Sequence, residues 1–129
     1  MKQKIKPPKE AEEQSMLFNW ADWKSYKYPE LQLMYHVPNG GSRNKIEAAR
    51  LKAQGVKPGV PDICLPVARS GYHGLYIELK RQEGGRVSDN QMVMLQNLAD
   101  QGYAVSVCKG WKAASKVIKD YLEGEYAYQ

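Results

Sequence analysis

Two short apolar segments of the sequence carry charged side chains that could act together on a substrate. Asp62 lies in Gly59–Leu65, and Glu78 and Lys80 lie in Gly74–Lys80. Both segments are rich in Ile, Leu, Val and Tyr and are bounded by Gly or Pro, which is typical of short strands. Carboxylate oxygens are the ligands that Mg²⁺ prefers, and a nearby ammonium group can stabilise charge that develops on phosphorus. If the two strands are neighbours, the residues therefore indicate metal-assisted chemistry on a phosphate.

A simpler interpretation of these three residues competes with the site. Asp62 could cap a turn, and Glu78 with Lys80 could be a solvated pair at a sheet edge, which is the usual role of an isolated Glu-x-Lys. Two observations favour the site. Asp62 follows a proline inside an otherwise apolar strand, and Glu78 interrupts an apolar run in which burial of an unpaired charge is costly. Because side chains alternate along a strand, Glu78 and Lys80 would share a face with Tyr76.

The elements that must position these residues follow from apolar periodicity and turn residues. Helices are expected at residues 9–24, 44–54, 88–101 and 111–122, and strands at 31–37, 59–65, 74–80 and 103–108. The short loop between the two acid-bearing strands predicts an antiparallel hairpin, in which Asp62 lies near Glu78. The helix before the last strand predicts a crossover back into the sheet, and Ser88 with Gln91 predicts a capping box at its start.

The first helix carries two acids whose roles the pattern leaves open. Glu13 lies on the apolar stripe of Leu17, and Glu10 extends the same side toward the N-terminus, because residues three and four apart are neighbours. A carboxylate at either position could reach a metal ion on the sheet. Acidic residues in a first turn more often complement the helix dipole, and spacing alone favours that interpretation.

Backbone amides and cations near the second helix could contact the phosphate backbone of DNA. Asn39 and Gly40 lie in a sharp turn that Arg43 follows, although a plain turn explains them equally well. The helix after this turn is expected to bury Ile46 and to expose its Lys and Arg residues. Together with Lys57, these cations flank the acids, where a phosphate backbone would need them, and a solvated helix face explains several of them as well.

The composition is that of one globular domain. The chain has 129 residues, of which 43% are hydrophobic and 26% are charged, and its formal net charge of +5 favours a polyanionic partner. Cys64 and Cys108 lack metal-binding spacing and are expected to be buried, reduced thiols. The absence of a membrane-spanning apolar run and of a signal-peptide pattern predicts a soluble cytoplasmic protein. We expect a flexible basic arm at residues 1–9, a domain at 10–122, and a tail at 123–129 that is ordered only by packing on a partner.

Four segments occur in a fixed order along the chain. They are Pro38–Arg43, Lys57–Asp62, Tyr76–Lys80 and Ser88–Gln91. Together they resemble the VRR-NUC family, the virus-type replication-repair nucleases, in its small stand-alone form, and the resemblance runs from about residue 10 to residue 121. It implies the PD-(D/E)xK, restriction-endonuclease-like fold, which is an α/β core with a central mixed sheet of about four strands flanked by helices.

The resemblance implies a metal site. Asp62 and Glu78 would bind Mg²⁺ or Mn²⁺ together with the carbonyl oxygen of Leu79. A glutamate of the first helix would complete the ligands. Glu10 matches the family's pattern because it stands four residues before a glutamine, and Glu13 is the alternative.

The same resemblance makes Lys80 the catalytic lysine and places Gln91 beside the site. The reaction implied is metal-dependent hydrolysis of a DNA phosphodiester. Because small relatives resolve four-way (Holliday) junctions as homodimers, the resemblance implies a homodimeric junction-resolving endonuclease. A monomeric flap or nicking endonuclease and a basic DNA-binding module without chemistry are the alternatives. No Gly-rich phosphate loop leads into a helix, so no small-molecule cofactor is expected.

Overall fold

At the centre of the protein, within the residues 6–38 and 44–126 that this computed structural model describes, four strands form a mixed sheet in the order β1–β2–β3–β4. The strands are β1 Tyr35–His36, β2 Ile63–Leu65, β3 Leu75–Lys80 and β4 Ala104–Lys109. The β2–β3 pair is antiparallel and the β3–β4 pair is parallel. The predicted hairpin and the predicted crossover are therefore both confirmed.

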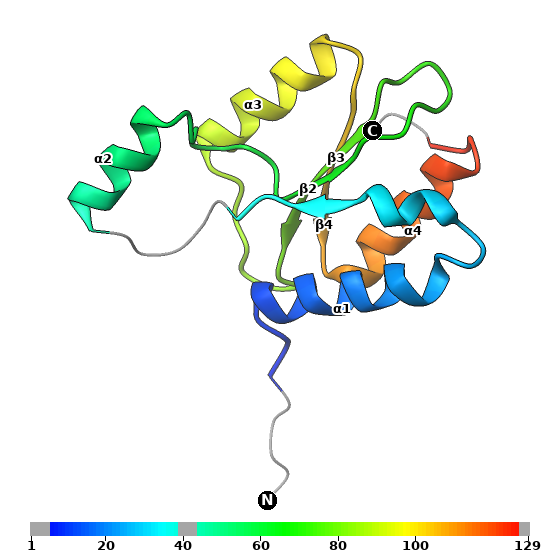
Figure 1. The fold of residues 1–129 in the computed structure, drawn as a ribbon. Helices are drawn as coiled ribbons and strands as arrows, with labels where there is room; N and C mark the ends of the chain where they lie inside the picture. Colours follow the sequence, from blue (N-terminus) through cyan, green and yellow to red (C-terminus); the bar gives the residue numbers. More distant parts are fainter. Residues whose placement is uncertain (1–5, 39–43, 127–129) are drawn as a thin grey trace, which may run out of the picture.

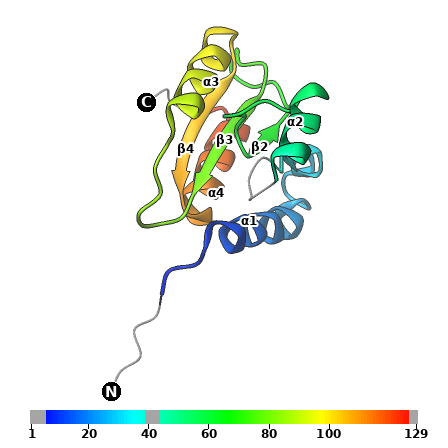
Figure 2. The ribbon, with the colours of Figure 1, turned by 90° about the vertical axis from the view of Figure 1, so that its left-hand side faces the viewer.

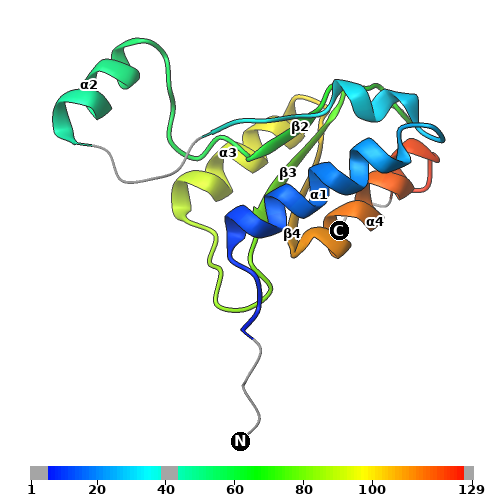
Figure 3. The same ribbon diagram turned by 60° about the horizontal axis from the view of Figure 1, so that its bottom comes forward.

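Helices cover both faces of this sheet, which confirms the predicted α/β class. They are α1 Glu10–Lys24, α2 Lys45–Ala53, α3 Asp89–Asp100 and α4 Trp111–Leu122, with a 3₁₀ turn, η1, at Pro29–Leu33. Figure 3 shows α1 and α4 in front of the strands and α3 behind them. Figure 2 shows α3 beside β4, whereas α2 lies on the opposite side, near β2.

The hydrophobic core lies between the sheet and the layer of α1 and α4. Alternate residues of β3, from Leu75 to Leu79, are at most 1% exposed and face this layer. Leu17 of α1 and Ile118 of α4 are fully buried in the same cluster. Full burial of one such side chain contributes about 1.5–3 kcal/mol to stability. Glu78 consequently belongs to the other face of β3, where its polar atoms must find partners.

The strand predicted at residues 31–37 is wrong over most of its length. Pro29 opens η1 instead, because its ring fixes φ near the helical value and its missing N–H is not needed at a helix start. Leu31, which is 3% exposed, anchors this turn in the core. Strand β1 therefore holds only two residues, and the Val37 N–H after it donates to the Asp62 carbonyl at 2.7 Å.

The second helix forms as predicted, but it is not packed as predicted. No residue of α2 is buried, and Ile46, which was expected to face inward, is 83% exposed. Figure 1 shows α2 projecting from the body of the protein. The start of the helix is fixed locally, because the Asn44 side chain accepts the Glu47 N–H at 2.7 Å. The apolar residues of α2 thus have helical spacing, but no other element of the described chain covers the helix face on which they lie.

The described part of the C-terminal segment packs on the protein's own sheet, so the expectation that only a partner orders it is wrong at Tyr126. The Tyr126 hydroxyl donates to the Val105 carbonyl of β4 at 2.6 Å, and its ring meets Tyr72 edge to face at 5.5 Å. Residues 127–129 of the tail and residues 1–5 of the predicted arm lie outside the described residues.

The two cysteines are buried free thiols, as predicted. Cys108 belongs to the core, and Cys64 lies on the opposite face of the sheet, because it alternates with the core residues of β2. Among the residues that the structure describes, no helix is both long enough and apolar enough to cross a membrane.

Candidate active site

Asp62 and Glu78 face each other across the β2–β3 hairpin. The register pairs Ile63 with Ile77, and its continuation by one residue sets Asp62 opposite Glu78. Asp62 lies just before β2, and its Oδ2 accepts the backbone N–H of Leu79 at 2.9 Å. The side chain thus continues the hydrogen-bond ladder before the strand itself begins. This contact holds the Asp62 carboxyl group at the sheet, next to Glu78.

Glu78 is a buried carboxyl group, only 1% exposed. Burial raises the pKa of Glu78 to about 8, and the neighbouring Asp62 carboxyl group adds to the shift. A buried carboxyl group next to a second acid favours a bound proton, or a cation, over a free negative charge. The Oε2 atom of Glu78 is buried and receives no hydrogen bond. It is therefore available to carry that proton or to bind that cation.

Gln91 joins Glu78 to Lys80 from the first turn of α3. Its Nε2 donates to Glu78 Oε1 at 3.1 Å, and its Oε1 accepts from Lys80 Nζ at 3.1 Å. Lys80 Nζ also lies 3.6 Å from Glu78 Oε1. The same Gln91 Oε1 accepts the Ser88 N–H at 2.8 Å, and Ser88 Oγ accepts the Gln91 N–H at 3.2 Å. The predicted capping box is confirmed, and it also orients the side chain that contacts both the acid and the lysine.

Gly59, which sequence reasoning did not single out, allows the segment before Asp62 to approach the start of α3, which carries Gln91. A Cβ at this position would lie 2.5 Å from the Asn90 carbonyl oxygen and 3.0 Å from the Gln91 amide nitrogen. Its φ of +82° also lies in the region that favours glycine. The segment that leads to Asp62 therefore runs directly against the start of α3. The available signal was the Pro58–Gly59 pair, which marks a turn without showing what the turn contacts.

Of the two candidate acids on the first helix, Glu10 is close enough to Asp62 for the charge of Asp62 to affect its pKa. Burial raises the pKa of Glu10, the charge of Asp62 raises it further, and the charge of Lys80 opposes both. Glu13 is fully buried, with its Oε2 3.4 Å from the Gln82 Nε2 atom, and its Oε1 has no partner. The structure thus places Glu10 toward the acid pair and Glu13 beside Gln82.

The residues present fit a hard divalent cation. Mg²⁺ is commonly bound by one or two carboxylates and keeps several waters or substrate phosphate oxygens. Asp62 and Glu78 supply two carboxyl groups, and Oε2 of Glu78 is a buried oxygen without a hydrogen bond. In the described part of the chain, no three Asp, Glu, His or Cys side chains are close enough to hold an ion by themselves. The pair therefore suits an ion that takes its remaining ligands from backbone, water and substrate.

The predicted phosphate contacts fall only partly within the described residues. Asn39, Gly40 and Arg43 lie outside them. Lys57 is exposed on the segment between α2 and β2, which continues to Asp62. The cations of α2 are exposed as well, and they are Lys45, Arg50 and Lys52. The described cations that were predicted to flank the acids thus lie on α2 and on the segment that leads from α2 to Asp62.

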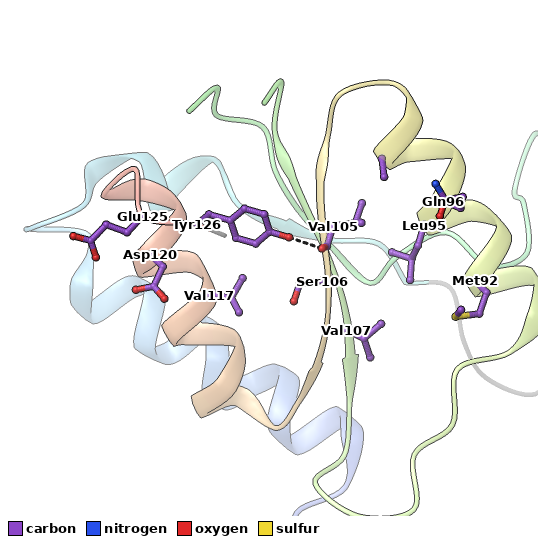
Figure 4. A pocket seen from close by; sticks show the side chains of 11 residues that line it. Met92, Leu95, Gln96, Val105, Ser106, Val107, Val117, Asp120, Glu125 and Tyr126 are labelled. Carbon is purple, nitrogen blue, oxygen red and sulfur yellow. Dashed lines mark hydrogen bonds between the residues drawn. The ribbon is translucent and has the colours of Figure 1, made fainter. Parts of the chain in front are cut away.

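A hollow of about 430 Å³ lies apart from these residues, along the outer edge of β4. Figure 4 shows it between α3 and α4, with Leu95 on one side, Val117 on the other and Val105 between them. None of the candidate site residues lines it. The hollow is therefore a separate feature of the fold.

Comparison with known proteins bears on the family and the fold of the chain. The model of the VRR-NUC domain matches residues 8–112 of the chain. A solved structure described as a VRR_NUC domain protein aligns with a TM-score of 0.81 at 32% sequence identity, over 95% of this chain and 94% of that chain. No curated protein matches the chain. The matched residues 8–112 include every candidate site residue, from the first helix to the start of α3.

Proposed function

The chain belongs to the VRR-NUC domain family, a family of nucleases, and from this premise we propose that it is a metal-dependent endonuclease that cuts branched DNA. The observation that carries the proposal is the buried carboxyl group of Glu78 beside the partly buried Asp62, with Lys80 in contact with Glu78. Buried charged groups cost several kcal/mol each in desolvation and are concentrated at functional sites.

The acids provide the metal site in this proposal. Asp62 and Glu78 hold Mg²⁺ or Mn²⁺, and the unpartnered Oε2 of Glu78 is the oxygen best placed to accept the ion. The carbonyl of Leu79 would be a further protein ligand, and Glu10 would complete the set by moving toward the pair, because no three acids of the described residues are close enough to hold an ion as they stand. When bound, the metal supplies Lewis-acid polarisation of the phosphate and lowers the pKa of a water molecule.

Lys80 acts on the phosphate itself. The residue is only 7% exposed and its ammonium group donates to the Gln91 side chain at 3.1 Å, so its position is set before the substrate arrives. A preorganised cation that donates to a phosphate oxygen stabilises the charge that builds during in-line attack. Gln91 acts as a positioning residue, because it holds the lysine and Glu78 through one amide group.

We propose that DNA approaches the acids from the side of α2. Asn39, Gly40, Arg43 and Lys57 are the proposed phosphate contacts. The exposure of Lys57 and of the α2 cations supports this direction, as does the formal net charge of +5. Such contacts position the DNA backbone without reading its sequence.

The proposed substrate is a four-way junction, and the proposed active form is a homodimer. The similarity to small stand-alone family members supports both, and a twofold dimer would offer two equivalent sites to two symmetry-related strands. A monomeric flap or nicking enzyme would cut flaps in preference to junctions and would scatter light as a single chain. A binding module would bind DNA without cutting it.

The deciding experiment compares cleavage of a mobile four-way junction, a flap and a linear duplex of matched sequence, with and without Mg²⁺. We expect metal-dependent cutting of the junction in preference to the duplex. Asp62→Asn and Lys80→Met should each lower cleavage about 100-fold or more while DNA binding persists. Glu12→Gln is the matched control, because Glu12 is an exposed acid of α1. Equal cutting of junction and duplex would contradict the junction proposal, and DNA binding without any metal-dependent cutting would contradict the nuclease proposal.

A further inference from the structure

Two tyrosines form a row on the sheet face that carries the candidate site. The register pairs Tyr35 of β1 with Cys64 of β2, and Cys64 with Tyr76 of β3. Paired residues on neighbouring strands point to the same face, so both rings flank Cys64. Asp62 and Glu78 form the next row on this face, two residues along each strand, which is a step of about 7 Å.

The core does not account for these rings. Tyr35 is 49% exposed on a strand of only two residues, and Tyr76 is partly exposed. Tyr103 lies two residues before Val105, the partner of Tyr76 in β4, and its ring lies 5.2 Å from that of Tyr76 in an edge-to-face arrangement. Among the described residues, none of the three belongs to the core cluster or to the aromatic side chains packed against it. Packing between neighbouring strands explains the contact between the rings of Tyr76 and Tyr103. It does not explain why the ring of Tyr35 is exposed.

The ionisation state of the rings suits contact with a nucleobase. A tyrosine phenol carries no charge at neutral pH, so neither ring repels phosphate. Neutral aromatic rings stack on nucleobases of any sequence, because every base has a π-face.

We propose that Tyr35 and Tyr76 form a stacking platform for an unpaired nucleobase next to the phosphate that is cut. The inference rests on the proposed nuclease function and adds a substrate requirement to it. The step of about 7 Å between the tyrosine row and the acid pair is about twice the 3.4 Å rise per nucleotide of a B-DNA strand. This separation suits a nucleotide that has been drawn out of its stack.

The platform gives a physical basis for preferring branched DNA. In a continuous duplex each base is stacked on its neighbours and paired, so its π-face is not available to the rings. Branch points, nicks and flaps contain bases that are unpaired or easily unstacked. Stacking would therefore favour these structures without any contact to a particular base edge.

The test measures binding without cleavage. The full-length protein is titrated, in a buffer with a metal chelator, into a single-stranded oligonucleotide and into its duplex. Each carries a fluorescent adenine analogue whose emission falls on stacking. We expect the wild type to quench the single strand, and Tyr35→Leu to weaken single-strand binding about 5- to 100-fold. Tyr35→Phe keeps the ring and should bind within about twofold of the wild type.

Tyr26→Leu is the matched control, because Tyr26 is 75% exposed just beyond α1 and outside the row. It should bind both DNA forms as the wild type does. Duplex affinity should be the same in Tyr35→Leu as in the control, because the duplex offers no base to the rings. Single-strand binding by Tyr35→Leu that equals the control, or an equal loss for duplex and single strand, would overturn the platform.

Cleavage in Mg²⁺ separates the platform from the nuclease function on which it rests. If the protein is a nuclease without a platform, Tyr35→Leu cuts branched DNA as fast as Tyr26→Leu. If the platform is correct, Tyr35→Leu loses its preference for branched over linear DNA. A wild type that neither binds nor cuts DNA overturns both proposals.

Discussion

At the scale of single residues, Glu78 shows how a buried carboxyl group is prepared for a ligand. Gln91 donates to its Oε1, whereas its Oε2 receives no hydrogen bond. With a pKa of about 8, the group holds its proton at neutral pH when no cation is present. A divalent cation would replace the proton, because a carboxylate must be ionised to act as a ligand.

The first prediction concerns the stability of the metal-free protein, which should fall as pH rises. The pKa of Glu78 is raised from 4.5 to about 8 on folding. Between these values the folded protein binds more protons than the unfolded chain, so the free energy of unfolding decreases with rising pH and levels off above about 8. Thermal melts from about pH 4.5 to 9 in chelating buffer measure the slope, and saturating Mg²⁺ should raise the Tm most at the alkaline end.

The matched variants identify the group responsible for this slope. Glu78→Gln cannot ionise and should remove most of the pH dependence. Glu12→Gln, an exposed acid of α1, should leave the slope as in the wild type. A slope that persists unchanged in Glu78→Gln would assign the effect to another group.

At the scale of elements, the start of α3 and the geometry of the site depend on the same contacts. The capping box between Ser88 and Gln91 satisfies backbone N–H groups of the first turn, and its glutamine side chain reaches Glu78. Gly59 lets the segment before Asp62 lie against this turn without a side chain between them. The position of the first turn of α3 therefore determines how close Gln91 lies to Asp62 and Glu78.

The second prediction tests this close approach with two glycines of similar backbone conformation. Gly59 and Gly55 have φ values of +82° and +101°, but an added Cβ would meet the Asn90 carbonyl at Gly59 and nothing within 4 Å at Gly55. Gly55→Ala should cost about 1 kcal/mol from backbone strain alone and leave cleavage unchanged. Gly59→Ala should cost about 1–3 kcal/mol more and lower cleavage at least about tenfold, because α3 must move with Gln91.

Denaturant titration gives both stabilities, and cleavage of one DNA substrate at a temperature well below both melting transitions gives the activities. Equal loss of stability in the two variants would show that the close approach at Gly59 is not a constraint. Wild-type cleavage by Gly59→Ala, despite its lower stability, would show that the position of α3 does not affect the site.

At the scale of the whole molecule, the features with local causes were the ones predictable from the sequence. The β2–β3 hairpin follows from two apolar strands and a short loop, and the capping box follows from Ser88 and Gln91. The strand at 31–37 was predicted wrongly, because its alternation is compatible with a strand, and the fold instead uses Pro29 and the burial of Leu31 to form η1.

The remaining features depend on partners that are distant in the sequence. Ile46 has helical spacing, but no other element covers α2, so spacing could not show its exposure. Glu10 and Glu13 lie one helical turn apart, and only the position of the sheet distinguishes the acid near Asp62 from the acid beside Gln82. The sequence marks Gly59 only as a turn residue, because its contact with the start of α3 joins segments that are distant in the chain.

The third prediction belongs to the assembled molecule and concerns paired cutting. If the active form is a homodimer, each protomer cuts one strand of a junction within the same complex. Wild-type and Asp62→Asn chains co-expressed in equal amounts with different tags should give mixed dimers, which can be isolated through both tags. We expect these mixed dimers to nick one strand of a junction and to release few resolved duplexes, because only one site per complex can bind the metal.

A denaturing gel counts nicks and a native gel counts resolved junctions. Resolution by mixed dimers at the wild-type rate, or failure to recover any mixed species, would mean that the protomers act independently.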